Sequence, residues 1–383
     1  WPNALLRERF AETLEEFAPD AVHFHNYVSL GDGLVSLARS SGASVIYTLH
    51  DFGLICPNNL LKRSDGALCG KSSPDFFQDC CPSTIRTGRG FTPLLIRGLP
   101  PLFRWQQFAA NQSGMLKRAA LSGLVKSLEA TAGAPEATGL PRKRSFYLEA
   151  TRRIFESAHR FLAPSAFLRD RFVSCGLDPD RVVHERYGMR HFPRARHAPA
   201  PDGCVRFGYI GAFHAHKGIE LLLDAFGRMQ GRATLHLYGS SFGSPVSESH
   251  FRKVTSDAAR GFVVHGRYDN AHVGEILAGL DAIVVPSVWY ENSPLVIQEA
   301  QIAGVPVITA DVGGMAELVR DGVDGLLFRF GDVGDLCRVM DSVIANPRSL
   351  DELRRNVPPV PTIEEQALRI REHYRSARGP SRS

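Results

Sequence analysis

The feature that most constrains the fold of this sequence is a repeated alternation of short apolar segments with helical patterns. Apolar runs of about four to eight residues suit strands that are buried on both faces, and the stretches between them suit helices that cover those faces. Such alternation predicts parallel α/β layers. In the C-terminal half, the expected strands are 205–211, 234–239, 261–266, 282–286, 305–309 and 325–328.

Helical patterns occupy the gaps between these strands. The clearest one begins near residue 218 and carries an apolar stripe at helical spacing, which predicts a face that packs on a sheet. The stripe is formed by Ile219, Leu222, Phe226 and Met229. Further helices are expected at 271–280, 294–303, 315–320 and 363–374.

The N-terminal half has the same character. An amphipathic helix at 5–17 precedes a strand at 21–25, and a helix at 30–40 leads to a second strand at 44–49. A linker rich in Pro, Ala and Arg follows at 191–203 and marks a domain boundary. We therefore predict a Rossmann-like domain at 1–195, a second at 203–355, and a terminal helix with a disordered tail at 360–383.

Composition excludes some classes of protein. A net charge of +5 over 383 residues is compatible with anionic ligands or an anionic membrane face but does not indicate nucleic acid. No apolar run reaches the roughly 18 residues needed to span a bilayer. Seven cysteines, an odd number in a long chain, do not suit a disulfide scaffold and favour a reducing cytoplasm.

Residues 83–145 form a basic and apolar insertion in the first domain. It contains ten Lys and Arg residues but only two acids, Glu129 and Glu136. A long insertion of this kind is often functional, and its composition fits contact with an anionic membrane or a lipid-linked acceptor. The alternative is a set of helices that pack on the first sheet and expose a basic face.

The segment from 281 to 325 carries the main chemical signal. Asn292, Ser293 and Pro294 open a helix, because Asn or Ser suits a cap and Pro suits the first turn. Glu291 precedes that start and Glu299 lies two turns in, up to about 12 Å away along the axis. Two acids at this separation can hold two ends of one elongated ligand, and the helix start offers free N–H groups to anions and hydroxyls. Taken alone, the spacing favours the alternative that both are ordinary surface acids of a helix.

These residues resemble a known family. ENSPLVIQE, followed by AGVPVI and GGMAELVRDGVDG, is similar to the E-x7-E region of the retaining glycosyltransferases of family 4, which have the GT-B fold. The resemblance implies two Rossmann-like domains facing a cleft. It also implies that Glu291 faces the transferred sugar, that Glu299 binds the ribose, and that amides near Asn292, Ser293 and Leu295 bind sugar or phosphate, with Pro294 shaping the turn.

The resemblance extends upstream through FGYIGAFHAHKGIELLLDAF. It implies that Gly211 belongs to the phosphate loop and that Lys217 neutralises a diphosphate leaving group. The family often has Arg directly after the loop glycine, whereas this chain has Ala212. Gly266 and Arg267 fall in the turn that the family places near the nucleobase.

The N-terminal half resembles a subgroup of the same family through TLHDFGLICP and HFHNY. The resemblance implies that His50 orients the donor sugar or the acceptor hydroxyl, and that His25, Asn26 and Asp51 line the cleft. For His50 and Asp51, a structural His–Asp hydrogen bond is the alternative. His23 and His25 share one strand face, which suits packing better than a metal pair.

Metal sites are not required by this interpretation. Cys56, Cys69, Cys80 and Cys81 could form a zinc site, but the adjacent pair is awkward for two ligands and free thiols are favoured. The DPD sequence at 178–180 resembles the metal-binding carboxylates of another glycosyltransferase fold, yet its context indicates a turn.

The resemblance implies a retaining glycosyltransferase that takes a UDP- or GDP-sugar as substrate, needs no cofactor, and acts on a glycan or lipid-linked acceptor in polysaccharide biosynthesis. The expected location is the cytoplasm, with peripheral contact at the inner face of the membrane. The family's first strand and glycine-rich loop are not found, so the first domain is expected to be truncated. Three alternatives are a catalytically inactive sugar-nucleotide or glycan-binding module, a sugar-nucleotide epimerase and a phosphorylase.

Overall fold

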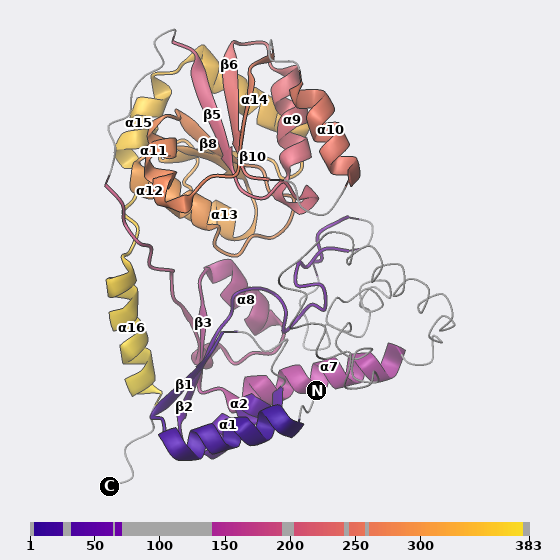
Figure 1. Cartoon of the computed structure of the whole chain (residues 1–383), viewed down its shortest axis with the longest axis vertical. Coiled ribbons are helices and arrows are strands. Elements are labelled where there is room, and N and C mark those ends of the chain that lie inside the picture. Colours follow the sequence, from indigo (N-terminus) through magenta and orange to yellow (C-terminus); the bar gives the residue numbers. More distant parts are fainter. Residues whose placement is uncertain are drawn as a thin grey trace, which may run out of the picture.

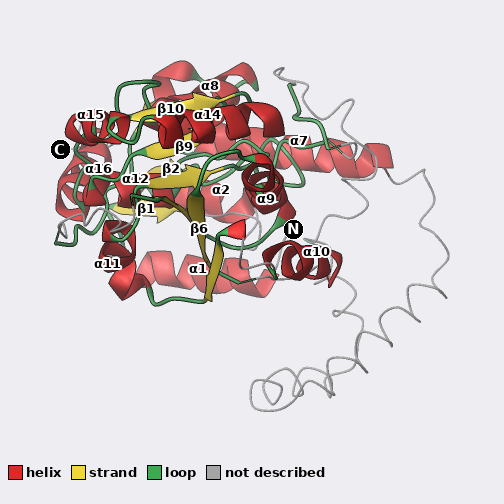
Figure 2. Cartoon of the chain, turned by 90° about the horizontal axis from the view of Figure 1, so that it is seen from above, coloured by secondary structure: helices red, strands yellow, loops and turns green. Residues whose placement is uncertain are grey.

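The computed structural model describes residues 4–25, 32–63, 66–70, 140–193, 203–240, 245–256 and 260–377. Within these ranges the chain forms two parallel sheets with helices on both faces of the strands (Figures 1 and 2). The expected α/β class with two parallel sheets is confirmed. Asn26, Cys80, Cys81 and residues 83–139 of the basic insertion lie outside the described residues.

The N-terminal sheet has four parallel strands in the order β1-β2-β3-β4. Its core holds Phe52, Phe161 and Phe172, which are fully buried. The elements are α1 (Ala4–Phe17), β1 (Ala21–Phe24), α2 (Asp32–Ser40), β2 (Ser44–Thr48), α7 (Leu140–Ser157), β3 (Arg160–Ala163), α8 (Ala166–Ser174) and β4 (Val182–His184).

The C-terminal sheet has six parallel strands in the order β10-β9-β8-β5-β6-β7. The chain runs outward from β5 to one edge and then returns through β8 to the other edge. The pair β5–β8 is therefore a topological switch point, where ligands of open α/β sheets bind beyond the strand ends. The strands are β5 (Val205–Ile210), β6 (Ala233–Tyr238), β7 (Phe262–Gly266), β8 (Ala282–Val285), β9 (Val307–Ala310) and β10 (Gly325–Phe328).

Helices connect these strands and cover the C-terminal sheet. Ile219, Leu222 and Phe226 of the predicted stripe are buried in the core, while Met229 ends the helix and is half-buried. The helices are α9 (Ile219–Arg228), α10 (Pro245–Thr255), α11 (Val273–Ala278), α12 (Leu295–Ala303), α13 (Gly313–Leu318), α14 (Val333–Ala345) and α15 (Ser349–Asn356).

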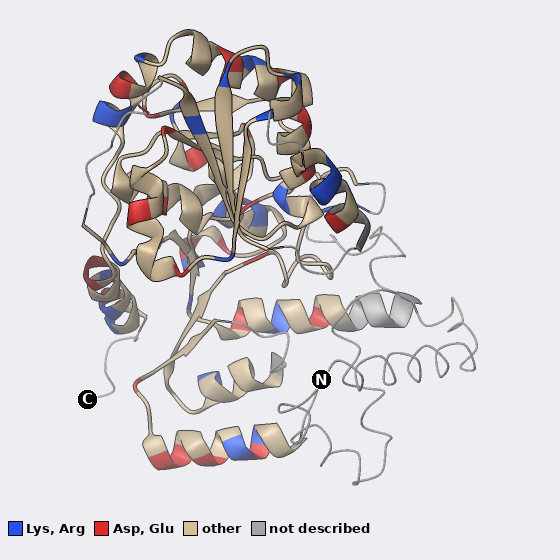
Figure 3. Cartoon of the chain, turned by 45° about the horizontal axis from the view of Figure 1, so that its top comes forward, with Lys and Arg blue, Asp and Glu red and all other residues tan. Residues whose placement is uncertain are grey.

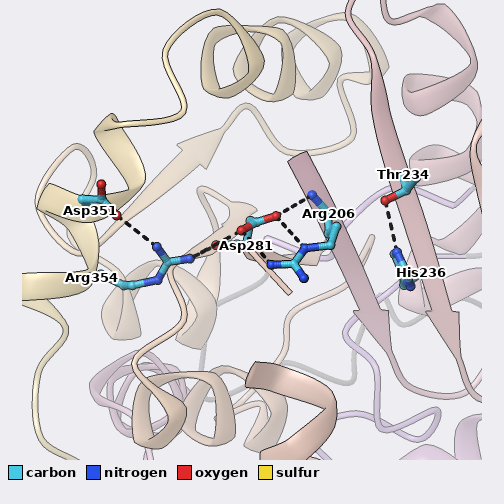
Figure 4. A network of polar contacts seen from close by, with 6 residues as sticks. All are labelled: Arg206, Thr234, His236, Asp281, Asp351 and Arg354. Atoms are coloured by element: carbon cyan, nitrogen blue, oxygen red, sulfur yellow. Dashed lines mark hydrogen bonds and ion pairs between the residues drawn. The ribbon is translucent and has the colours of Figure 1, made fainter. Parts of the chain in front are cut away.

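A polar network ties three elements of the C-terminal domain together (Figure 4). The Asp281 carboxylate, in the turn before β8, accepts from the backbone N–H of Arg206 at 2.7 Å and from its guanidinium at 3.0 Å. Arg354 of α15 donates to the Asp281 carbonyl at 3.1 Å. Because the buried carboxylate has both charge and hydrogen-bond partners, the cost of its desolvation is offset.

The last helix, α16 (Ile363–Ser376), returns to the N-terminal domain and runs beside its strands (Figure 1). A capping box between Thr362 and Glu365 fixes its start. Arg369 and His373 then contact the carboxylate of Glu185 at 2.8 and 3.2 Å. This contact ties α16 to the segment that directly follows β4.

We expect Glu185→Gln to loosen α16. Burial alone would raise the pKa of Glu185, but hydrogen bonds from His373 and Arg369 outweigh it and hold that pKa below its usual value. Losing the charge should weaken docking by about 1–2 kcal/mol, and amide hydrogen exchange of α16 should quicken roughly 5–30-fold at neutral pH.

The pH dependence of this contribution follows from the lowered pKa of Glu185. The carboxylate's contribution is complete above its unfolded pKa and disappears as pH falls through the lower folded-state pKa. The exchange difference between wild type and Glu185→Gln should therefore shrink in acid. Equal exchange in the two proteins at neutral pH would contradict this role for Glu185.

Lys, Arg, Asp and Glu are interspersed over the outer helices of the C-terminal domain (Figure 3). Among the described residues, no helix is both long and apolar enough to cross a bilayer.

Candidate active site

A cavity of about 330 Å³ lies at the switch point of the C-terminal sheet. Gly211 and Ala212, directly after β5, form one side, and Pro286 and Ser287, directly after β8, form the other. The cavity is also lined by Lys217, Glu291, Pro294, Leu295 and Glu299, so six of the residues predicted from the sequence to bind a donor share one site: Gly211, Lys217, Glu291, Pro294, Leu295 and Glu299.

Lys217 and Glu291 form an ion pair in the cavity. The Lys217 Nζ lies 2.8 Å from Glu291 Oε1, and the Ser287 hydroxyl donates to the same oxygen at 2.7 Å. The Lys217 ammonium also lies 5.4 Å from the centre of the Trp289 ring, within cation–π range. Glu291 is buried, whereas Lys217 is about one-third exposed. A cation held in this position in the cavity can stabilise negative charge on a bound ligand.

Glu299 marks another part of the cavity, where Tyr268 and Asn270 also line the wall. Burial raises the pKa of Glu299, and a hydrogen bond from the Asn270 side chain opposes that rise. Burial and the nearby Glu299 charge likewise raise the pKa of the Tyr268 phenol. This part of the site therefore offers a desolvated hydrogen-bond acceptor beside an aromatic ring, which suits a sugar hydroxyl.

The start of α12 differs in detail from the prediction. Pro294 occupies the cap position with an extended ψ of 118°, and no side chain caps the helix. Helical geometry begins at Leu295, so Asn292 and Ser293 do not act as caps. The first N–H groups of α12 lack intrahelical acceptors and lie beside the cavity, because Leu295 and Val296 line it.

Four other predicted donor-site residues do not line the cavity. Asn292 turns its side chain to the N-terminal domain, and the Ser293 hydroxyl accepts from Gln298 at 3.3 Å. Gly266 accepts from the Gly239 N–H at 2.7 Å and ends β7, and Arg267 follows it. The contacts of these residues with a donor stay a prediction.

The predicted histidines of the N-terminal domain form one chain of rings. His25 Nδ1 lies 2.9 Å from His50 Nε2, and His50 Nδ1 lies 2.7 Å from the Tyr187 hydroxyl. His23 stacks on His25 at 4.2 Å between ring centres and forms hydrogen bonds with Thr48 and Tyr374.

Burial, with neighbouring His25, His50 and His373, lowers the pKa of His23 to about 3. Burial also lowers the pKa of His25 and His50, so these imidazoles are neutral at pH 7.

The alternative of a His50–Asp51 hydrogen bond is wrong. Both ring nitrogens of His50 are engaged by His25 and Tyr187. Asp51 instead accepts from the Gly53 N–H at 2.7 Å, and burial raises its pKa. Asp51 therefore stabilises the turn after β2.

The cysteines and the DPD sequence form no metal cluster among the described residues. The Cys56 thiol is buried and donates to Asn58 Oδ1 at 2.7 Å, and Cys69 is a free thiol. Asp178 caps a short 3₁₀ turn at Pro179–Arg181 by accepting from Asp180 N–H at 2.9 Å, so its predicted turn is confirmed.

Gly218 positions Lys217 at the cavity. Its φ is +74°, and a Cβ there would lie 1.9 Å from the Pro286 carbonyl oxygen. We expect Gly218→Ala to lower the free energy of unfolding by more than about 1 kcal/mol, because both the conformation and the space exclude a side chain. Gly227→Ala on the exposed face of α9 is the matched control and should be neutral or stabilising. Thermal unfolding midpoints that move in the same direction for both variants would contradict this account.

Sequence reasoning missed four polar residues that line the cavity: Tyr209, Tyr268, Asn270 and Ser287. The Tyr209 hydroxyl donates to the Ala212 carbonyl at 2.7 Å and so supports the loop after β5. Ser287 could have been found from its place at the carboxyl end of β8, directly after the strand. Tyr268 lies beyond β7 in a loop with no periodic signal, and Asn270 begins the short 3₁₀ turn Asn270–His272 that follows it.

Comparison with known proteins agrees with this geometry. The family model described as Glycosyl transferases group 1 matches residues 204–346, which contain the whole cavity. Residues 204–346 are therefore similar to the group 1 glycosyltransferases. It is 34% identical over 185 residues to D-inositol 3-phosphate glycosyltransferase of Geodermatophilus obscurus, covering 45% of this chain and 40% of that protein. It is 28% identical over 216 residues to alpha-maltose-1-phosphate synthase of Mycolicibacterium smegmatis, covering 50% and 55%.

Solved structures extend the likeness from this segment to the whole fold. Anabaena Alr3699/HepE in complex with UDP has a TM-score of 0.62 at 15% identity, covering 97% of this chain and 82% of that one. The lipopolysaccharide outer core galactosyltransferase WaaB has a TM-score of 0.59, covering 98% and 79%. The chain therefore has the GT-B architecture. The sequence matches span 35%, 40% and 55% of three of its curated relatives.

Proposed function

We propose that this chain is a retaining glycosyltransferase that moves a sugar from a nucleoside diphosphate sugar to a glycan or lipid-linked acceptor. The observation that carries the proposal is the convergence of Lys217, Glu291 and Glu299 on one cavity at the switch point. One compact cation and two separated acids match a ligand with an anionic centre and hydroxyls at both ends.

Each residue has a distinct role in this proposal. Lys217 and the first amides of α12 stabilise the charge that develops on the diphosphate as the bond from the sugar's anomeric carbon to oxygen breaks. Glu291 faces the transferred sugar, and Glu299 accepts from the ribose hydroxyls. His50 orients the donor sugar or the acceptor hydroxyl, which attacks from the face that the diphosphate leaves.

The donor is a UDP- or GDP-sugar, and UDP is the first probe because the Anabaena neighbour was solved with UDP. The acceptor belongs to polysaccharide biosynthesis and is met at the cytoplasmic face of the membrane. The excess of Lys and Arg over acids in 83–145 supports that location. Flotation with liposomes tests it: binding only to vesicles with anionic lipid supports it, and equal failure with neutral and anionic vesicles contradicts it.

Nucleotide release from a panel of UDP- and GDP-sugars tests the activity, with Glu291→Ala as the comparison. Release by wild type alone, and a product with the donor's anomeric configuration by NMR, supports a retaining transferase. Nucleotide binding with no release points to an inactive binding module. Conversion of the sugar nucleotide without an acceptor points to an epimerase, and release that depends on inorganic phosphate points to a phosphorylase.

A further inference from the structure

The loop after β8 holds three consecutive residues whose side chains contact two different parts of the molecule: Tyr290, Glu291 and Asn292. Glu291 faces the cavity, where it meets Lys217 and Ser287. Tyr290 on one side of it and Asn292 on the other pack against the N-terminal domain. Any shift of that domain is therefore passed to Glu291 through its immediate neighbours in the chain.

Tyr290 belongs to the hydrophobic core of the N-terminal domain although it lies in the C-terminal one. Its ring is 9% exposed and lies 4.8 Å from Phe167 and 6.3 Å from Phe52 between ring centres. The Arg171 guanidinium lies 5.3 Å from the ring centre and donates to the Tyr290 hydroxyl at 3.3 Å. These contacts fix the ring from three directions.

Asn292 uses both ends of its amide on the N-terminal domain. Its Oδ1 accepts from the Ser165 hydroxyl at 2.8 Å, and its Nδ2 donates to the His50 carbonyl at 3.1 Å. Ser165 is also the cap of α8 and accepts from the Leu168 N–H at 3.2 Å. The side chain is 8% exposed, so each of its hydrogen bonds is shielded from water.

A second contact holds the same end of α8. The Glu317 carboxylate, on α13, accepts from the N–H of Ala166 at 2.8 Å and from the N–H of Phe167. A carboxylate suits this position because a helix N-terminus is positively polarised. The helix α13 also reaches the loop directly, since the Gly314 N–H donates to the Glu291 carbonyl at 3.0 Å.

We infer that Tyr290 and Asn292 are positioning residues that place Glu291 in the cavity only when α8 is docked on this loop. The inference rests on the proposed function and deepens it. The part of the cavity near Glu299, Tyr268 and Asn270 is built within the C-terminal domain. Nucleotide affinity is therefore independent of the docking contacts, whereas the sugar-transfer step depends on them.

The test is Asn292→Ala, assayed for UDP affinity by calorimetry and for donor turnover. We expect the Kd for UDP to stay within about threefold and kcat to fall about 10–100-fold with little change in KM, as a misplaced catalytic group would cause. Ser165→Ala should behave in the same way, and Ser165→Thr should restore kcat. Ser342→Ala, which removes a side-chain hydrogen bond at 2.7 Å to the Val339 carbonyl within α14, is the matched control.

Amide hydrogen exchange gives a readout that needs no activity. In Asn292→Ala, exchange of the Gly314 amide, which reports on the Glu291 carbonyl, should rise at least fivefold, while wild type and Ser342→Ala agree. Unchanged Gly314 exchange overturns the inference, and so does a Kd for UDP that rises in parallel with the loss of kcat. If the wild-type protein neither binds UDP nor turns over any donor, the proposed function is refuted instead. Exchange of the Gly314 amide then still shows whether Asn292 holds Glu291 in place.

Discussion

Replacing Lys217 with methionine should lower kcat for donor turnover about 10²–10³-fold, the usual loss when one preorganised charge partner of a transition state is removed. Lys217 is the one basic side chain among the described residues that line the cavity. Ala212 supplies no second cation after the loop glycine. The variant keeps the length of the side chain and loses its charge, so the effect reports on electrostatics rather than on packing.

The same substitution also leaves Glu291 without its ion-pair partner, although Ser287 still donates to it. A double-mutant cycle with Glu291→Gln alone and the double variant Lys217→Met/Glu291→Gln separates the two effects, because its coupling term measures the part of the loss that passes through the ion pair. Lys253→Met, on the exposed face of α10, is the control for loss of a lysine and should retain wild-type turnover. A fall in kcat of less than about fivefold for Lys217→Met would contradict the role given to this residue.

Glu299→Ala should have the opposite kinetic profile. Loss of charged acceptor bonds to the ribose, each worth about 1.5–3 kcal/mol, should raise the Kd for UDP about 10–100-fold. Turnover at saturating donor should change much less, because the ribose interaction is the same in the ground state and the transition state. Glu275→Ala, at an exposed position of α11, is the control for loss of a glutamate.

The pH dependence of UDP affinity adds an independent check on Glu299. Burial raises the pKa of this carboxyl, so its protonation begins at a higher pH than for an exposed glutamate. The ionised form is the better acceptor, and affinity should therefore weaken as pH falls through that raised pKa. The Glu299→Ala variant should lack this part of the pH dependence, and an identical profile in both proteins would count against the ribose contact.

The sequence predicted the strands well because each is a nearly continuous apolar run that a parallel sheet buries on both faces. The predicted 282–286 and 325–328 correspond to β8 and β10 within one residue at each end. The helices α10, α14 and α15 were missed, since no motif marked them. Strand order was also out of reach, because pairing β5 with β8 depends on contacts between segments about 75 residues apart.

The site was predicted in part for a similar reason. Sequence motifs identify Lys217, Glu291 and Glu299, whereas Tyr268 lies in a loop without a pattern. The direction of the Asn292 side chain depends on Ser165, which is 127 residues away. No local signal in the sequence encodes a contact between domains, so the sequence does not predict the side-chain contact of Asn292 with Ser165.

A crystal structure of the chain with UDP would show directly where the nucleotide binds. We expect UDP in the cavity at the β5–β8 switch point, with its β-phosphate within hydrogen-bonding distance of Lys217 Nζ and the ribose hydroxyls on the Glu299 carboxylate. UDP bound outside this cavity, or with its ribose on Lys217 and its phosphates on Glu299, would contradict this expectation.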